Sequence, residues 1–240
     1  MVIIPAFNEQ EALVGVLAEL RALPAIEGVT IETVVVDDGS ADRTSEVARQ
    51  GGARVLRLCR NIGSGGAVQS GLRLARREVF DLAVQCDGDG QHPPSEIAKL
   101  VANANGADLV IGTRFIDNAT FRSTPLRRLG IWWLRGVLRF VARVRISDPT
   151  SGFRLYGARA LALFDETYPY DFPEPESLAI ARAAGLKVGE TAVAMRTRQG
   201  GTSSIAGFST VYYMLKVTIA VVLMYTRSRR AGSKDDAAGS

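Results

Sequence analysis

Short apolar runs rich in β-branched residues alternate with segments of helical periodicity through the first half of this chain, and that alternation restricts the fold more than any other feature. The expected strands are Val2–Pro5, Ile31–Val36, Val55–Cys59, Leu82–Cys86 and Asp108–Ile111. The expected helices fall between them, at Glu9–Leu23, Ala41–Gln50, Gly65–Arg77 and Pro94–Ala104. Strands that alternate with helices at this spacing predict the α/β class, with a doubly wound, mostly parallel sheet flanked by helices.

The second half of the chain is less regular. The pattern predicts a helix over Pro125–Val144, a turn over Asp148–Gly152, a helix over Pro173–Ala184, a strand over Lys187–Met195 and an apolar helix over Val211–Tyr225. We expect one domain over residues 1–204, an apolar, membrane-associating helix over residues 205–230, and a disordered polar tail over residues 231–240.

Two acidic pairs follow predicted strands directly: Asp37 with Asp38, and Asp87 with Asp89. Ligands of doubly wound sheets bind beyond the carboxyl ends of the strands, so both pairs are candidate site residues. Neighbouring carboxylates repel each other unless a cation compensates, and Mg²⁺ or Mn²⁺ prefers such oxygen ligands. Asp87, Asp89 and the amide of Gln91 are therefore a predicted Mg²⁺ or Mn²⁺ site. The alternative is an Asp-Gly turn with solvated carboxylates.

The remaining motifs are weaker. Residues 61–66, Asn-Ile-Gly-Ser-Gly-Gly, open a helix after a strand, where free N–H groups favour phosphate, although close helix packing explains the glycines equally well. His92 is the single histidine and precedes two prolines, so we favour a structural or supporting role for it over that of a general base. Cys59 and Cys86 lie in strand-like runs and are expected to be buried free thiols. The sequence offers no defensible Ser-His-Asp triad and no zinc-ligand spacing.

The net charge of +4 is distributed unevenly along the chain. The stretch from Arg114 to Arg159 contains ten arginines, no lysine and two acidic residues, an excess that points to phosphates or an anionic membrane surface. A helix over Leu126–Val144 would carry a basic stripe opposite an apolar face, which is the pattern of an interfacial helix or of an ordinary amphipathic helix packed on the sheet. The stripe is Arg128, Arg135, Arg139 and Arg143, and the apolar face is Trp133, Val137, Phe140, Val141 and Val144. Because the helix has an apolar face and the stretch lacks lysine, no nucleic acid is expected as a partner.

Five ordered blocks of the sequence resemble family 2 glycosyltransferases of the GT-A fold. The blocks are Pro5–Glu9, Val36–Ser40 with Asp42 and Thr44, Asp87–Pro94, Gly112–Arg114 and Asp148–Arg154. Within that family the closer likeness is to the dolichyl-phosphate and polyprenyl-phosphate mannosyltransferase type. The resemblance spans about Val2 to Ser204 and implies the GT-A fold for the first domain.

The resemblance also implies a role for each matching residue. Pro5, Ala6, Glu9, Asp38 and Asp87 would bind the nucleotide, with Asp38 contacting the base. The metal ligands would be Asp87, Asp89 and Gln91. The catalytic residues would be Asp89, Arg114 and Glu176, the last on a helix where the family often has an acid; Asp171 and Glu174 compete for that place. Arg114 would meet the donor or acceptor phosphate, and Arg196 and Arg198 resemble the loop that closes over the site. Together with Arg127 and Arg128 of the arginine-rich stretch, they are the candidate residues for binding the acceptor phosphate.

The activity that the resemblance implies is a metal-dependent, inverting transfer of a sugar from a nucleotide-sugar donor to a polyprenyl phosphate. Negative charge develops on the leaving nucleoside diphosphate, and a divalent metal and arginines would stabilise it. A phosphate acceptor is already anionic and needs no strong general base. Two alternatives stay open: a glycosyltransferase that extends a cell-surface saccharide through a hydroxyl acceptor, and a non-catalytic subunit that binds nucleotide.

The expected location is cytoplasmic and peripheral, on the inner face of the plasma membrane. The first basic residue is Arg21, so the beginning of the sequence does not resemble a signal peptide. Val211–Tyr225 is shorter than a usual membrane span and contains Lys216. Extended back to Phe208, the segment nears the length of a membrane span, with Arg227, Arg229 and Arg230 as a cytoplasmic flank. We favour a helix that lies on the membrane surface or docks on a membrane-protein partner, and a spanning helix stays open as the alternative.

Overall fold

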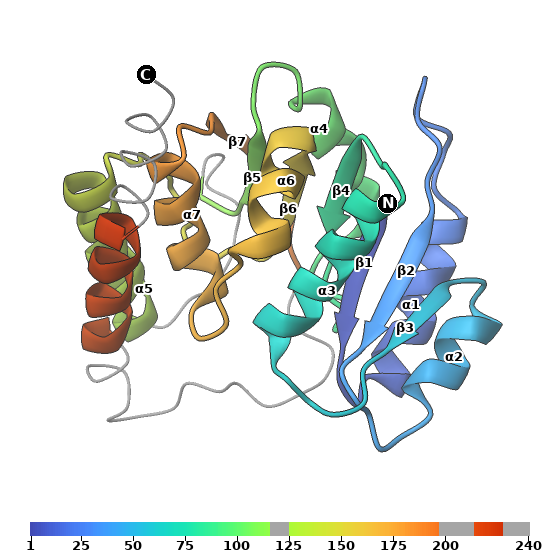
Figure 1. The fold of residues 1–240 in the computed structure, drawn as a ribbon. Helices are drawn as coiled ribbons and strands as arrows, with labels where there is room; N and C mark the ends of the chain where they lie inside the picture. Colours follow the sequence, from blue (N-terminus) through green and yellow to red (C-terminus); the bar gives the residue numbers. More distant parts are fainter. Residues whose placement is uncertain (116–124, 197–213, 228–240) are drawn as a thin grey trace.

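The computed structural model describes residues 1–115, 125–196 and 214–227, and within the helix that begins at residue 125 it describes side chains from Leu129 onward. A seven-stranded sheet forms its centre (Figure 1). The strands are β1 (Val2–Ala6), β2 (Thr33–Asp37), β3 (Arg54–Arg57), β4 (Leu82–Gln85), β5 (Leu109–Thr113), β6 (Arg154–Gly157) and β7 (Val188–Ala192). Their order is β3-β2-β1-β4-β6-β5-β7, and among these strands β6 alone is antiparallel to its neighbours.

Helices cover both faces of the sheet, which confirms the predicted doubly wound α/β class. One face packs against α1 (Gln10–Arg21), α2 (Thr44–Gln50), the 3-10 turn η1 (Pro94–Glu96) and α4 (Ile97–Ala102). The other packs against α3 (Ser64–Arg77), α5 (Pro125–Val137), the π-helical turn η2 (Leu138–Ala142), α6 (Ala158–Glu166), α7 (Pro173–Ala183) and the helix at 214–227. The strands β1, β2, β4 and β5 are largely apolar because both of their faces are buried. In β2, Val34 and Val36 enter one core and Val35 the other.

The sequence did not predict β6 or α6, although β6 lies between β4 and β5. This strand is four residues long and begins with a charged residue, Arg154, so it lacks the apolar signature of a central strand. The Arg154 guanidinium is fully buried, and it donates hydrogen bonds to the carbonyl of Ser151, the hydroxyl of Ser177 and the carbonyl of Glu174. Those three acceptors compensate the cost of burying the charged guanidinium.

The predicted arginine stripe is not continuous in the structure. The α-helix ends at Val137, a π-helical turn follows, and Arg143 has a left-handed backbone with φ of 54°. Arg139 and Arg143 are exposed, whereas Arg135 turns inward, donates a hydrogen bond to the Ser147 carbonyl and lies over the ring of Phe115. The prediction failed because it carried 100° per residue through a segment that changes its helical pitch. The prediction for Cys59 was also wrong, since Cys86 is buried but Cys59 is exposed.

The helix at 214–227 lies beside α5 (Figure 1). The indole nitrogen of Trp133 donates a hydrogen bond to the Thr218 hydroxyl at 3.0 Å, and Val217 and Val221 are buried in the core on that side. Within the described part of the chain, no helix combines the length and apolar character needed to cross a membrane.

Candidate active site

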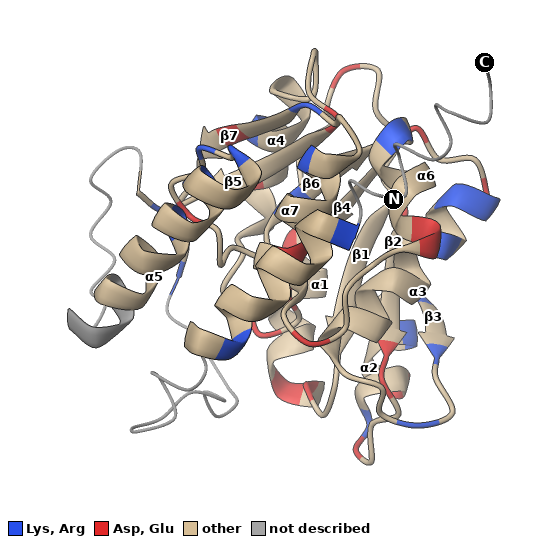
Figure 2. Ribbon diagram, turned by 60° about the vertical axis from the view of Figure 1, so that its left-hand side comes forward, with Lys and Arg blue, Asp and Glu red and all other residues tan. Residues whose placement is uncertain are grey.

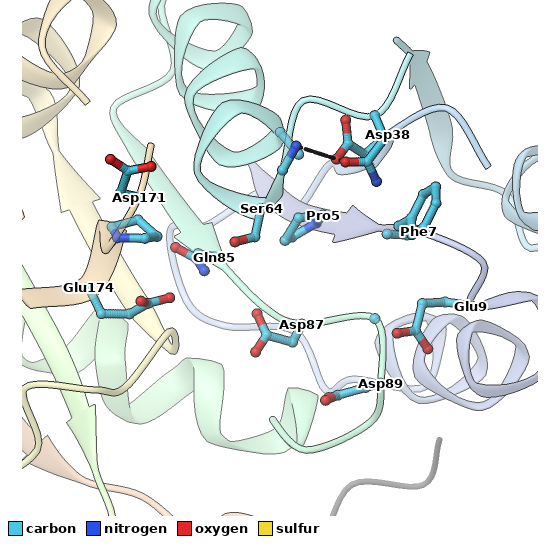
Figure 3. A pocket seen from close by; sticks show the side chains of 16 residues that line it. Pro5, Phe7, Glu9, Asp38, Ser64, Gln85, Asp87, Asp89, Asp171 and Glu174 are labelled. Atoms are coloured by element: carbon cyan, nitrogen blue, oxygen red, sulfur yellow. Dashed lines mark hydrogen bonds between the residues drawn. The ribbon is translucent and has the colours of Figure 1, made fainter. Parts of the chain in front are cut away.

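A pocket of about 510 Å³ lies at the carboxyl ends of β1, β2 and β4 (Figure 3). It brings together the five residues predicted to bind nucleotide, and Asp89 with them. The lining residues are Pro5, Ala6, Phe7, Glu9, Asp38, Asn61, Gly63, Ser64, Ala67, Gln85, Asp87, Gly88, Asp89, Asp171, Pro173 and Glu174. Their clustering follows from the topology, because parallel strands end at one edge of the sheet.

Asp38 forms one end of the pocket and fixes the loop beside it. Its carboxylate accepts hydrogen bonds from the backbone N–H groups of Ile62, at 2.8 Å, and Gly63, at 2.9 Å. Burial raises the pKa of Asp38, and these two hydrogen bonds partly offset that effect. Gly39 permits the close approach of the loop, since it has φ of 74° and a Cβ there would lie 2.8 Å from the carbonyl carbon of Arg60. Asp38 therefore holds Gly63 on the pocket wall, and its predicted contact with a base stays a prediction.

Asp87 and Asp89 lie near the middle of the pocket, in the turn that follows β4 (Figure 3). Asp89 accepts a hydrogen bond from the backbone N–H of Gln91 at 2.9 Å, which closes the turn. His92 is 2% exposed, stacks on Phe153 with ring centroids 4.9 Å apart, and accepts the backbone N–H of Asp87 at Nδ1. The structural role expected for His92 is confirmed: its ring anchors the backbone from which the Asp87 carboxylate projects.

The donor atoms at this turn fit a hard divalent cation. Asp87 and Asp89 offer carboxylate oxygens on one pocket wall, whereas Gln91 does not line the pocket. Among the described residues, no group of three His, Cys, Asp or Glu side chains forms a complete metal cage. Two carboxylates suit Mg²⁺ or Mn²⁺, which usually completes its coordination with water and substrate phosphates.

The acidic residues at the start of α7 separate into two environments. Asp171 and Glu174 line the pocket, whereas Glu176 does not. Burial raises the pKa of Glu174, with Arg154 opposing the shift and Asp87 adding to it. Glu176 is 5% exposed, its Oε1 has no hydrogen-bond partner among the described residues, and burial raises its pKa to about 7. The pocket therefore receives Glu174 from this helix rather than Glu176, the residue predicted from the sequence.

Arg114 forms a buried ion pair outside the pocket lining. Its Nε donates to Asp148 at 2.6 Å and its Nη2 donates to the same carboxylate at 3.0 Å, while its side chain is 3% exposed. The guanidinium also lies 5.6 Å from the centre of the Phe115 ring, and that of Arg135 lies 5.2 Å from it. Arg114 thereby ties the end of β5 to the turn at residues 148–152. Its predicted contact with a phosphate stays a prediction.

The remaining predicted arginines are placed only in part. Arg196 pairs with Glu19 of α1 at 2.5 Å, and its backbone N–H donates to the carbonyl of Gln91, so it lies next to the turn of Asp87 and Asp89. Arg127 and Arg128 belong to the first turn of α5, with side chains outside the described residues. Arg198 also lies outside the described residues.

Sequence reasoning did not assign Phe7, Gln85 or Ala67 to the site, and it left the segment at 61–66 undecided. The structure supports the close packing, whereas phosphate binding at this segment stays a prediction. Gly63 and Ser64 line the pocket at the start of α3, while a Cβ at Gly65 would lie 2.6 Å from the carbonyl oxygen of Pro169. Gln85 is the last residue of β4, and its polar side chain at a strand end is a signal that would have identified it.

Comparisons with known proteins agree with this geometry. Residues 1–163 match the family described as glycosyl transferase family 2. The chain is 31% identical over 218 residues to the undecaprenyl-phosphate mannosyltransferase of Micrococcus luteus, covering 86% of this chain and 87% of that protein. It is 30% identical over 230 residues to the polyprenol monophosphomannose synthase of Mycolicibacterium smegmatis, covering 90% of this chain and 84% of that protein.

The fold is also similar to that of a solved structure, glucosyl-3-phosphoglycerate synthase from Mycobacterium tuberculosis in complex with Mn²⁺, uridine diphosphate and glucosyl-3-phosphoglycerate. The TM-score is 0.65 at 22% identity, and the match covers 93% of this chain and 78% of that chain. At this identity the likeness establishes the fold.

Proposed function

The chain belongs to glycosyl transferase family 2, and on that premise we propose that it transfers a sugar from a nucleotide-sugar donor to a polyprenyl phosphate. The observation that carries the proposal is the position of Asp87 and Asp89 in a pocket whose one end is the loop held by Asp38. Relatives that match along most of their length are named for polyprenyl-phosphate acceptors, which favours such an acceptor over a saccharide hydroxyl.

The nucleoside of the donor binds between Pro5, Phe7 and the loop at Asn61 and Gly63, and the diphosphate lies over Asp87 and Asp89. A bound Mg²⁺ or Mn²⁺ would neutralise charge on the diphosphate as the bond to the sugar breaks. The solved neighbour was crystallised with Mn²⁺ and uridine diphosphate, which supports such an ion here. His92 holds the turn on which both carboxylates depend.

The transfer is a single displacement with inversion at the anomeric carbon. The acceptor phosphate carries its own negative charge, so the chain needs cations more than it needs a base. Arg114, Arg127, Arg128, Arg196 and Arg198 are the proposed cations, and Arg196 already lies beside the catalytic turn. Arg114 contributes indirectly in the described state, because its guanidinium is occupied by Asp148.

The enzyme acts peripherally on the cytoplasmic face of the plasma membrane, where its lipid acceptor is held. Large apolar side chains gather on α5, η2 and the helix at 214–227, with exposed fractions between 45% and 84%. They are Leu129, Trp132, Trp133, Phe140, Leu215, Ile219 and Leu223. Neither α5 nor the helix at 214–227 contains an acidic residue, and α5 accordingly shows none of the red that marks Asp and Glu in Figure 2. Apolar side chains flanked by arginine are the composition of a helix at a membrane surface.

A product assay tests the function. The purified enzyme is incubated with Mn²⁺, a panel of nucleotide sugars and either undecaprenyl phosphate or an oligosaccharide acceptor, and the products are identified by mass spectrometry. We expect a sugar phosphoprenol, loss of activity with EDTA, and its return with Mn²⁺ or Mg²⁺. Asp89→Asn should abolish transfer and leave the melting temperature within a few degrees of the wild type. Products from the oligosaccharide alone would favour a hydroxyl acceptor, and binding without any product would favour a non-catalytic subunit.

A further inference from the structure

The pocket has two ends, with Asp87 between them (Figure 3). Asp38 and the loop that it holds form one end, and Asp171, Pro173 and Glu174 form the other. A nucleotide sugar is linear in the order base, ribose, diphosphate, sugar. When the diphosphate lies at Asp87 and the nucleoside extends toward Asp38, the sugar extends toward Glu174.

Glu174 is held rigidly at that end of the pocket. The buried guanidinium of Arg154 donates to the Glu174 carbonyl at 2.8 Å and to the Ser177 hydroxyl at 2.6 Å. Pro173 and Pro175 flank Glu174, and each proline ring fixes its own φ. The backbone of Glu174 is thus fixed from three sides, and its carboxylate points toward Gln85 and Asp87 (Figure 3).

Gln85 gives the same end a fixed amide. The Tyr156 hydroxyl donates to Oε1 of Gln85 at 3.0 Å, and Tyr156 itself is fully buried and lies 3.3 Å from the hydroxyl of Tyr168. With its oxygen occupied, the Gln85 amide offers N–H donors, whereas the Glu174 carboxylate offers acceptors. An acceptor and a donor on rigid supports match the hydroxyl groups of a sugar, each of which can donate and accept.

We propose that Glu174, together with Gln85, binds hydroxyl groups of the donor sugar and selects among nucleotide sugars. This inference rests on the proposed function and adds a residue that recognises the sugar of the donor. Glu174 acts here as a specificity residue, because an anionic phosphate acceptor has no proton that a base must remove.

Binding of nucleotide and nucleotide sugar, compared by calorimetry in Mn²⁺, tests the inference. The probes are UDP, GDP, UDP-glucose, UDP-N-acetylglucosamine and GDP-mannose. In Glu174→Ala, the nucleotide sugar that the wild type prefers should bind roughly 10- to 150-fold more weakly, the range for a lost hydrogen bond to a charged group. The affinity for the matching nucleoside diphosphate should not change. The differences in affinity among the nucleotide sugars should become smaller. Glu166→Gln is the control, since it removes an exposed carboxylate outside the pocket lining.

A second variant keeps the test informative if Glu174→Ala unfolds. Glu174→Asp retains the charge but has a shorter side chain. It should therefore lower the affinity for the nucleotide sugar and leave the affinity for the nucleoside diphosphate unchanged. Equal loss for both kinds of probe, or no loss for either, overturns the inference and leaves the proposed function standing. A kcat that falls and loses an ionisation in Glu174→Gln, at unchanged donor affinity, also overturns it, because that is the signature of a base. A wild type that binds none of the probes overturns the proposed function and this inference together.

Discussion

The Glu176 carboxyl shows how a single buried acid makes the stability of this protein depend on pH. Burial raises its pKa from 4.5 to about 7, with Asp171 contributing repulsion. The folded state therefore binds the proton more tightly than the unfolded state, so the free energy of unfolding falls as the pH rises from about 4.5 to 7. In Glu176→Gln this loss is absent. We expect the variant to be more stable than the wild type at pH 8, on the order of 2 kcal/mol, and similar to it near pH 4.5.

Urea unfolding of both proteins at pH 4.5 and pH 8 measures the difference. Glu166→Gln is the matched control, since its carboxyl is exposed and its loss should leave the pH dependence unchanged. If the free energies of unfolding of the wild type and Glu176→Gln change equally between pH 4.5 and pH 8, the Glu176 carboxyl is not the origin of the pH dependence.

His92 provides a second test at the same scale. Replacement by Phe keeps the ring stacked on Phe153 but removes the acceptor for the Asp87 N–H. We expect the free energy of unfolding to fall by about 1–3 kcal/mol, the cost of an unsatisfied buried donor. The Mn²⁺ concentration for half-maximal activity should also rise, because the turn that carries Asp87 loses its anchor. His92→Asn restores an acceptor and should recover part of both effects; identical Mn²⁺ dependence in all three proteins would contradict the anchoring role.

At the scale of helices and strands, substituting alanine at two helical glycines should change the stability in opposite directions. A Cβ at Gly71 of α3 would overlap the Ile3 side chain of β1, whereas a Cβ at Gly15 of α1 would meet nothing within 4 Å. Gly71→Ala should therefore destabilise the fold by about 1–3 kcal/mol, because the helix must move off the sheet. Gly15→Ala should stabilise it by about 0.5–1 kcal/mol through helix propensity. Thermal unfolding of the pair checks this, and an unchanged melting temperature for Gly71→Ala would mean that α3 can shift without loss.

Most of the strands and helices could be predicted from the sequence, but some could not. The strands β1, β2, β4 and β5 were predicted because each is an apolar run buried on both faces, and the helices between the strands because each has one apolar face. β3 was predicted from the short apolar run that begins at Val55 and Leu56, which are partly buried. β6 was missed because its first residue is a cation whose partners, Ser151, Glu174 and Ser177, become neighbours through tertiary structure. The pocket residues at strand ends were predicted for a topological reason. The choice between Glu174 and Glu176 depends on the rotation of α7 about its axis, which no local pattern fixes.

For the whole molecule, the apolar residues of α5, η2 and the helix at 214–227 predict salt-sensitive binding to anionic vesicles. Arginines near such a surface contribute about 1 kcal/mol each, and burial of apolar side chains adds to that. Trp132→Ser with Phe140→Ser should weaken binding roughly tenfold or more, since these side chains are 67% and 84% exposed. Val79→Ser is the control, because Val79 is 85% exposed but lies beyond the end of α3.

Co-sedimentation with vesicles of phosphatidylglycerol and phosphatidylcholine at two salt concentrations measures this binding. Equal sedimentation of the double variant and the wild type would place the membrane contact elsewhere. Sedimentation that does not depend on the salt concentration would show that the arginines do not contribute to vesicle binding.

The antiparallel strand β6 has a consequence for how the protein is made. β6 pairs with β4 on one side and with β5 on the other, so β4 and β5 do not pair with each other. On the ribosome, β5 emerges about forty residues before the strand that joins it to the rest of the sheet. Until residue 157 leaves the exit tunnel, β4 presents an unpaired edge. The Arg154 side chain lacks its partners on α7 for longer, until Glu174 and Ser177 have also emerged. During synthesis the chain therefore passes through an interval in which one edge of β4 is open, and an open strand edge is a site at which another chain can pair.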